Sequence, residues 1–357
     1  MYWNGYRLTA LAAVATSLTF CSLPGRAVAG GYTFTQIDNP LAAFGIVDQG
    51  THLFGLNNIG QAAGAYFDGS IWKGFLYDNG TFIPVHDSNQ GPTGGIFPAG
   101  INDSTQLVGY YYDANLTWRG FSYLGGAYSA LDNPIAGSAQ FLGTVPVGIN
   151  NTGMVVGYYR QVYDVAHGFL YSPGTSSFST IDDPNADFSA VPGKGDGTAA
   201  RGINSSGKIV GTYVDTTGVL RGFVYDGAVF TTLSDPLGVS TTPNSINDAG
   251  DIVGTYNDAG GTPHGFLYDG LTFTTIDVPG AAGGTIVWGI NNTGEISGYA
   301  YANASKTITH GFFGTPLIPA TAAEPGSIGL AGLGLATLLG LRRQRRRSRR
   351  CPTVPIC

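Results

Sequence analysis

Six side chains that can carry positive charge recur at one position of an internal repeat, directly before a Gly-Phe pair. They are Lys73, Arg119, His167, Arg221, His264 and His310. If the repeats surround an axis, these side chains lie at one radius and together would bind an anion or an acidic glycan. The alternative is structural: a residue that recurs in every repeat usually serves the repeat, and each side chain would then pair with an aspartate or a carbonyl group of a neighbouring strand or repeat.

Metal binding is the other chemistry that histidines at this position suggest. Equivalent positions on different units of a ring are usually too far apart for metal–ligand bonds of about 2 Å, and Lys or Arg replaces His in the other units. The turn from Asn247 to Asp251 lacks the bidentate Glu that completes a calcium-binding loop. We therefore expect no metal site and no other cofactor.

Motifs of nucleophilic catalysis are absent from the sequence. There is no Gly-x-Ser-x-Gly elbow and no phosphate loop that ends in Gly-Lys-Ser or Gly-Lys-Thr. Aspartates could form a carboxylate pair for glycoside cleavage, but most of them recur at turn positions. Trp72, Trp118 and Trp288 could stack on sugars, or they could pack between repeat units. The sequence favours a binding or structural module over an enzyme.

The repeat that positions these residues is built around an Asn that follows Ile or Leu. It occurs at Asn57, Asn102, Asn150, Asn204, Asn247 and Asn291, with steps of 45, 48, 54, 43 and 44 residues. Each unit offers four short strands, with an Asn-x-x-Gly turn between the first two and hairpin turns such as Asp226-Gly227 between the last two. Four strands in about 45 residues match one blade of a β-propeller.

The ends of the array predict how the ring closes. The sixth unit stops at Gly314 without a fourth strand, and a spare copy of that strand occurs at 32–38, before the first unit. We therefore predict an all-β fold over residues 30–316, a closed propeller of six four-stranded blades in which the N-terminal strand completes the last blade. Closure removes exposed strand edges. An open solenoid, the alternative, would need terminal caps that the sequence does not show.

Charge and cysteine content limit the partners of the repeat region. Residues 30–320 hold eight basic and 22 acidic residues, so nucleic acid is not an expected partner. The three cysteines, Cys21, Cys351 and Cys357, all lie outside the repeats, so the propeller must fold without disulfide bonds.

The N-terminus reads as a secretory signal peptide over residues 1–29. Arg7 supplies the positive charge, residues 8–20 form the apolar segment, and Ala27 and Ala29 provide the small side chains of a cleavage site. The alternative, a membrane anchor, is disfavoured because 13 apolar residues are short of the roughly 20 that span a bilayer.

The C-terminus carries a second targeting pattern after a linker at 317–323. Glu324 and Pro325 come first, an apolar stretch at 326–341 follows, and an arginine run begins with Arg342 and Arg343. Segment 324–350 resembles the PEP-CTERM sorting signal of Gram-negative bacteria, although Ala323 replaces its first proline and a tail, 351–357, follows the arginines. The resemblance implies an exosortase-type processing enzyme as partner and a transient transmembrane helix anchored in the inner membrane, with the arginines in the cytoplasm. Nucleic-acid binding by the arginines, the alternative, does not suit a run behind an apolar segment.

The repeats themselves also resemble a known family. The Gly-Ile-Asn-x-x-Gly-x-Ile-Val-Gly segments and the triplets at His167, His264 and His310 are similar to bacterial extracellular HAF repeats, over nearly all of residues 32–314. This resemblance implies no established catalytic activity. We expect an exported, non-catalytic module of the cell envelope, outer surface or extracellular matrix that associates with exopolysaccharide or a surface protein. The alternative is a propeller glycan hydrolase or lyase with carboxylates at the channel mouth.

Overall fold

The computed structural model describes residues 27–45, 48–161, 165–189 and 197–317, and all of their regular structure is β-strand. No helix among these residues is long and apolar enough to cross a membrane. The predicted sorting segment, with Glu324, Pro325, Arg342 and Arg343, lies outside the described residues, as does most of the predicted signal peptide. Ala27 and Ala29 lie within them, on a short strand described below.

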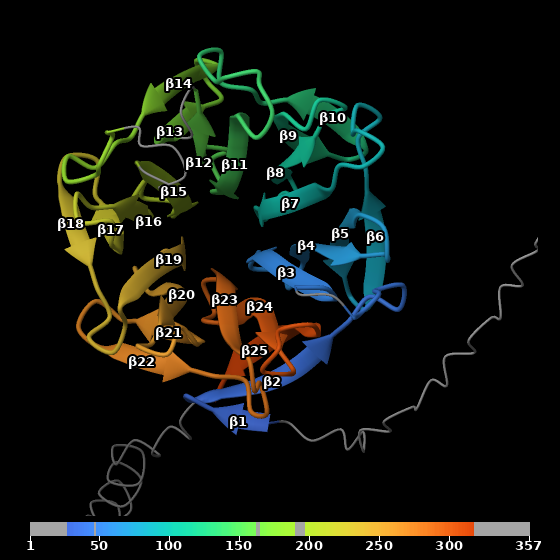
Figure 1. The fold of residues 1–357 in the computed structure, drawn as a ribbon, viewed down its shortest axis with the longest axis vertical. Helices are drawn as coiled ribbons and strands as arrows, with labels where there is room; N and C mark the ends of the chain where they lie inside the picture. Colours follow the sequence, from blue (N-terminus) through green and yellow to red (C-terminus); the bar gives the residue numbers. More distant parts are fainter. Residues whose placement is uncertain (1–26, 46–47, 162–164, 190–196, 318–357) are drawn as a thin grey trace, which may run out of the picture. The chain divides into compact units, whose positions relative to one another are not determined.

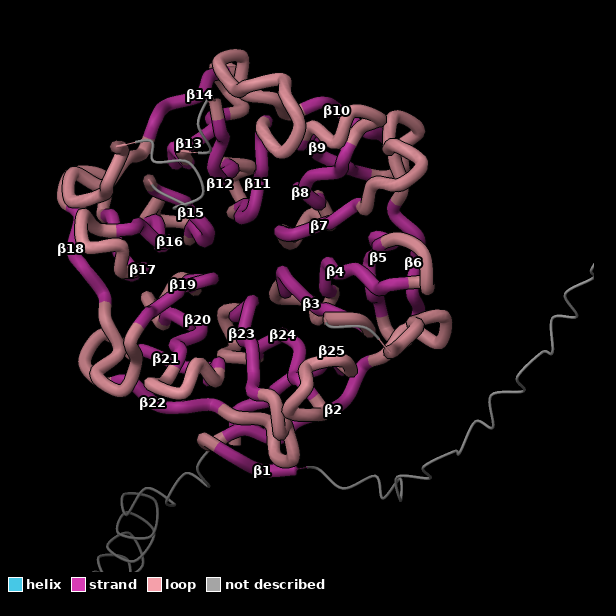
Figure 2. The backbone as a smooth tube through the Cα atoms, viewed as in Figure 1, coloured by secondary structure: helices cyan, strands magenta, loops and turns pink. Residues whose placement is uncertain are grey.

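The strands form six antiparallel units of four around a central axis, as Figures 1 and 2 show. Blade 1 is β3 (Thr51–Leu56), β4 (Ala62–Phe67), β5 (Trp72–Asp78) and β6 (Thr81–Val85). Blade 2 is β7 (Ile96–Ile101), β8 (Leu107–Tyr112), β9 (Trp118–Leu124) and β10 (Ala127–Ala130). Blade 3 is β11 (Gly143–Ile149), β12 (Val155–Arg160), β13 (Ala166–Ser172) and β14 (Ser177–Thr180).

The second half of the ring repeats this order. Blade 4 is β15 (Thr198–Ile203), β16 (Ile209–Val214), β17 (Leu220–Tyr225) and β18 (Phe230–Leu233). Blade 5 is β19 (Ser240–Ile246), β20 (Ile252–Asn257), β21 (Pro263–Tyr268) and β22 (Phe273–Ile276). Blade 6 is β23 (Gly284–Ile290), β24 (Ile296–Tyr301), β25 (Thr309–Pro316) and β2 (Tyr32–Ile37), with β1 (Ala27–Ala29) added outside β2.

The β-propeller class is confirmed, but the described hydrogen-bonded sheets number five instead of six. Blades 2 and 3 merge into one eight-stranded sheet because Gly143 of β11 pairs in parallel with Trp118 of β9. A Cβ atom on Gly143 would lie 2.0 Å from the Trp118 carbonyl oxygen, so only glycine permits this approach. One bridge between neighbouring units therefore accounts for the difference from six separate sheets.

The N-terminal strand closes the ring as predicted. β2 runs antiparallel to β25 from the pair Tyr32–Pro316 to the pair Ile37–Gly311. Phe34 packs edge-on against Phe312 with ring centroids 5.4 Å apart, inside the blade 6 core. This pairing leaves blade 6 without an open fourth position.

Each blade core is built from the phenylalanine of the Gly-Phe pair. These side chains are at most 2% exposed: Phe75, Phe121, Phe169, Phe223, Phe266 and Phe312. In five blades the ring lies against the glycine of the second strand, and in blade 1 a Cβ atom on Gly64 would lie 2.5 Å from the Phe75 ring. The glycine and the phenylalanine recur together because each makes room for the other.

Candidate functional site in the central channel

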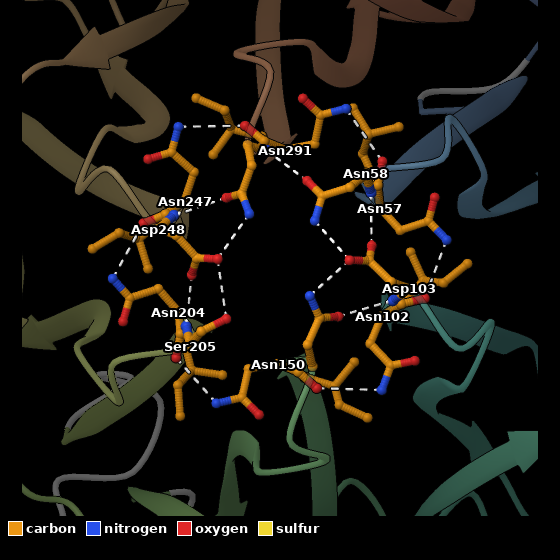
Figure 3. Close-up of a pocket in the computed structure, with 18 residues that line it drawn as sticks. Asn57, Asn58, Asn102, Asp103, Asn150, Asn204, Ser205, Asn247, Asp248 and Asn291 are labelled. Atoms are coloured by element: carbon orange, nitrogen blue, oxygen red, sulfur yellow. Dashed lines mark hydrogen bonds between the residues drawn. The ribbon is translucent and has the colours of Figure 1, made fainter.

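The first strand of each blade lines the channel and ends at the recurrent asparagine. Each asparagine donates from Nδ2 to the backbone oxygen of its counterpart in the next blade, at 3.0–3.3 Å, through the full circle (Figure 3). Their side chains are buried, and each Oδ1 atom accepts a backbone N–H in its own turn. We call this set the Asn ring. It ties the blades together, whereas the sequence had indicated only its role in the turns.

A second ring, the mouth ring, follows the Asn ring by one residue and is more exposed. It consists of Asn58, Asp103, Asn151, Ser205, Asp248 and Asn292. The two aspartates belong to blades 2 and 5 and face each other across the axis (Figure 3). Asp103 accepts from Asn58 and Asn151 at 2.8 and 2.7 Å. Asp248 accepts from Ser205 and Asn292 at 3.1 and 2.7 Å.

These are the channel-mouth carboxylates that the enzymatic alternative requires. Burial alone would raise the pKa of Asp248, but hydrogen bonds from Ser205 and Asn292 outweigh it and hold that pKa below its usual range. A general acid in glycoside cleavage needs the opposite shift. Among the described residues, no group of three or more His, Cys, Asp or Glu side chains is arranged to hold a metal ion.

A β-bulge in each first strand creates a third ring deeper in the channel, which we call the bulge ring. In blades 2 to 6, one residue is left without a partner where the register shifts, and in blade 1 the shift spans Phe54 and Gly55. The bulge ring is Phe54, Ala99, Val147, Arg201, Asn244 and Trp288. A bulge turns the extra side chain out of the ladder, and here all of these residues except Phe54 line one channel cavity. Unlike the Asn ring, this position has a different residue in every blade.

The glycine after the bulge explains how the first strands come so close together. A Cβ atom on Gly148 would lie 2.5 Å from the Arg201 carbonyl oxygen, and one on Gly55 would lie 2.9 Å from the Ala99 carbonyl oxygen. Five blades have glycine at this position, and blade 5 has Ser245. The bulge residues of neighbouring blades are thereby brought around one small space.

That space is a cavity of about 90 Å³ between the bulge ring and the Asn ring. Its lining includes Arg201, Asn244 and Trp288 from three consecutive blades. The Arg201 guanidinium carbon lies 5.6 Å from the centroid of the Trp288 ring. Burial lowers the pKa of Arg201, while the phenols of Tyr158, Tyr110 and Tyr299 act in the opposite direction.

Aromatic side chains extend from this cavity as a continuous chain of ring contacts, the aromatic arc. Its members, in order of contact, are Tyr299, His52, Trp72, Phe97, Tyr110, Trp118 and Tyr158, and successive centroids lie 3.6, 4.7, 5.9, 5.1, 6.4 and 6.1 Å apart. The arc crosses blades 6, 1, 2 and 3. In blades 4 and 5, Thr212 and Thr255 occupy the position of Tyr110, so the arc breaks the symmetry of the repeat.

The arc combines packing with unused polar groups. Trp72, Phe97, Tyr110 and Tyr158 remain partly exposed, although the arc also packs between blades. The indole N–H of Trp118 has no hydrogen-bond partner among the described residues. Burial lowers the pKa of His52 to about 3, so this imidazole is neutral at ordinary pH. The three tryptophans that the sequence suggested for sugar stacking lie in neighbouring blades 1, 2 and 6, and Trp288 of the bulge ring packs against the cluster of Trp72 and that of Trp118.

The predicted cationic positions lie elsewhere, on the third strand of each blade. Each contacts an aspartate within its own blade, with nitrogen–oxygen distances of 3.7 Å for Lys73–Asp68, 3.0 Å for Arg119–Asp113, 2.7 Å for His167–Asp182, 2.5 Å for Arg221–Asp215, 2.8 Å for His264–Asp277 and 2.7 Å for His310–Asp38. None of the six lines the two channel pockets described here. The structure therefore does not bring them together, and their binding role stays a prediction.

His264 gives this pairing a measurable pH dependence. Burial alone would lower its pKa, but Asp277 and Asp258 outweigh it and raise that pKa above 6.5. The stabilisation is therefore fully present below pH 6.5 and is lost as the pH rises through the folded-state pKa. We expect His264→Gln to lower the melting temperature by about 1–2 °C at pH 5.5 and by less at pH 8.5, because partly exposed pairs are weak. An equal loss at both pH values would contradict this role.

Comparisons with known proteins concern the fold. No family model and no curated protein sequence matches this chain. A six-bladed β-propeller lectin of Aleuria aurantia is 14% identical, with a TM-score of 0.38 over 63% of this chain and 76% of the lectin. AofleA of Arthrobotrys oligospora is 15% identical, with a TM-score of 0.45 over 69% and 80%. The sialidase of Trypanosoma rangeli is 9% identical, with a TM-score of 0.49 over 92% of this chain and 65% of the sialidase. The chain is a β-propeller, and that assignment rests on its own strand arrangement.

Proposed function

We propose that this protein is an exported, non-catalytic β-propeller that binds polysaccharide at the aromatic arc. The observation that carries the proposal is the arc itself, a row of rings across four blades that interrupts an otherwise regular repeat. Aromatic faces are suited to sugars, whose C–H faces stack on rings. Repeat symmetry alone does not account for the arc, because the position of Tyr110 holds tyrosine in blades 2, 3 and 6, alanine in blade 1 and threonine in blades 4 and 5.

The destination of the protein is part of the same proposal. The leader with Ala27 and Ala29, the segment 324–350 and the HAF-like repeats support export, processing by an exosortase-type enzyme and residence in the envelope or the extracellular matrix. Cleavage after Ala29 would remove β1 and leave β2 as the first strand of the mature chain. The propeller keeps its closure in that case, because β2 pairs with β25 without help from β1.

The test is size-exclusion chromatography of purified residues 30–316 with the extracellular polysaccharide of the producing organism. We expect the protein to co-elute with polymer of unchanged size. Trp72→Leu, which removes a partly exposed ring of the arc, should weaken co-elution about tenfold, because a stacked ring contributes roughly 1–3 kcal/mol. Phe188→Ala, which removes an exposed ring stacked on His167 outside the arc, is the control and should leave it unchanged. Independent elution of wild type and polymer would overturn the proposal.

A glycan hydrolase or lyase remains the second candidate because Asp103 and Asp248 face each other at the channel mouth (Figure 3). Each carboxylate accepts hydrogen bonds from two neighbours, which suits a structural ring. The same chromatography separates the two functions, since an enzyme would shorten the polymer. If it does, Asp103→Asn and Asp248→Asn must each abolish the shortening for these residues to be its cause.

A further inference from the structure

We propose that the cavity between the bulge ring and the Asn ring is a subsite for a small acid. The acid would be a carboxylate that carries a hydroxyl group on a neighbouring carbon, bound by Arg201 and Asn244 beside Trp288. This inference deepens the proposed function by naming the chemistry bound next to the arc. Polysaccharide binding at the arc could be correct without it.

Arg201 is a cation without a counter-ion. Among the described residues it forms no ion pair, and its Nε atom has no hydrogen-bond acceptor. Its surroundings are the Trp288 ring and the phenols of Tyr110, Tyr158 and Tyr299. A partly buried guanidinium is costly unless an anion or an equivalent acceptor meets it, and a carboxylate matches its planar pair of donors.

Asn244 supplies the complementary group. Its side chain is 4% exposed, and Nδ2 donates to the Val287 backbone oxygen at 2.8 Å. That bond fixes the amide orientation, so Oδ1 is left as a buried acceptor without a partner on the lining of the cavity. A carboxylate alone cannot satisfy it, because Oδ1 needs a donor such as a hydroxyl.

Trp288 lines the same cavity as Arg201 and Asn244. Its Nε1 atom lies beside the Tyr299 hydroxyl, so what Trp288 offers the cavity is its ring. Two unsatisfied polar atoms, Arg201 Nε and Asn244 Oδ1, therefore lie on neighbouring blades around one space. The equivalent residues of blades 1 to 3 are Phe54, Ala99 and Val147, so repeat architecture requires neither the arginine, the asparagine nor the tryptophan.

The volume of the cavity limits what enters it. At about 90 Å³, the cavity is smaller than the roughly 150 Å³ cavity that accommodates benzene. A carboxylate with one adjacent carbon and hydroxyl fits this space, whereas a whole sugar ring does not. The ligand is therefore a small hydroxy acid, or the acid group of a uronate whose ring lies outside the cavity against the arc.

The experiment is isothermal titration calorimetry of residues 30–316 with glycolate, acetate, glucuronate and glucose. We expect glycolate to bind more tightly than acetate, and Arg201→Gln to weaken glycolate at least tenfold. Lys208→Gln, which removes another cation of the same blade that lines neither channel pocket, is the matched control and should change nothing. Arg201→Gln should fold, because it removes an unpaired cation from a site of low polarity.

Each outcome has a defined meaning. Binding of glucuronate but not glucose identifies the acid group of a uronate as the source, and binding of glycolate alone identifies a free hydroxy acid. Equal affinity for glycolate and acetate, or an Asn244→Ala variant that keeps the preference for glycolate, removes the role of Asn244. If neither acid binds, the cavity holds water only and the proposal is wrong. Polymer co-elution that survives in Arg201→Gln would leave the arc function standing while the subsite is tested separately.

Discussion

A chain that starts at Asn39 is expected to lose its cooperative fold, because it lacks the strand that completes blade 6. Tyr32 and Phe34 are 4% and 6% exposed in the closed ring, and burying each large side chain contributes about 1.5–3 kcal/mol. Their loss, together with the ladder along β25, approaches the entire net stability of a typical domain, about 5–15 kcal/mol. Thermal unfolding followed by circular dichroism should show a broad transition or none.

A rearranged chain provides the control for this truncation. Residues 32–38 can be moved behind Pro316 through a two-residue Asn-Gly turn, because Tyr32 pairs directly with Pro316 in the antiparallel register. The moved strand should restore a sharp transition close to that of the intact protein. A truncated protein that unfolds at the same temperature as the intact one would show that closure by β2 is not what stabilises the ring.

Asn150→Ala is expected to lower the free energy of unfolding by about 2–4 kcal/mol. The change leaves the backbone N–H groups of Thr152 and Met154 without their partners, and the carbonyl of Asn204 loses one of its two donors while Gly207 N–H remains. Each buried group that loses its hydrogen bond costs about 1–3 kcal/mol, part of which water recovers at the mouth. Urea unfolding of the wild type and the variant gives the difference.

Two neighbouring variants separate the ring from the turn. Asn150→Asp keeps both bonds to the turn but turns a carboxylate oxygen, in place of the donor, toward the Asn204 carbonyl oxygen, so any loss it shows reports the link between blades. Asn151→Ala changes an exposed residue of the mouth ring and should stay within about 0.5 kcal/mol. Equal losses for Asn150→Ala and Asn151→Ala would mean that the Asn ring does not hold the blades together.

Much of the fold was predictable because the residues that determine each blade recur in every repeat unit. The glycine that faces each buried phenylalanine, the Asn-x-x-Gly turns and the spare strand before Asn57 are all local patterns, and they predicted both the blade and its closure. The merged sheet of blades 2 and 3 reflects where one strand begins. Parallel bridges like that of Gly143 and Trp118 also join Gly50 to Thr309 and Gly197 to Ala166, but there they lie outside the strands. In each case a glycine before threonine meets the residue that precedes the cation of the Gly-Phe motif, so the contact follows the repeat although the sequence analysis did not predict it.

The candidate site was harder to predict because its residues do not recur. The repeat pattern predicted a binding role for the six cations before Gly-Phe. The structure places these cations on the third strands, where each contacts an aspartate. Arg201 and Asn244 occupy the position that varies most, and the bulge that turns them inward is a property of backbone register rather than residue type. A comparison of the residue two places before Ile-Asn in each unit would have singled them out as departures from the repeat.

The bulge also separates the variable side chain of each first strand from the residues that hold the ring together. Its residue has no partner in the ladder, while the glycine or serine after it and the asparagine beyond it carry the packing and the links between blades. Phe54 and Val147 pack in buried clusters and Asn244 links two blades, whereas Ala99, Arg201 and Trp288 are partly exposed. Side chains at these three positions can be exchanged with little change to the frame around them. A library randomised at Ala99, Arg201 and Trp288 would therefore be a practical starting point for engineered binders.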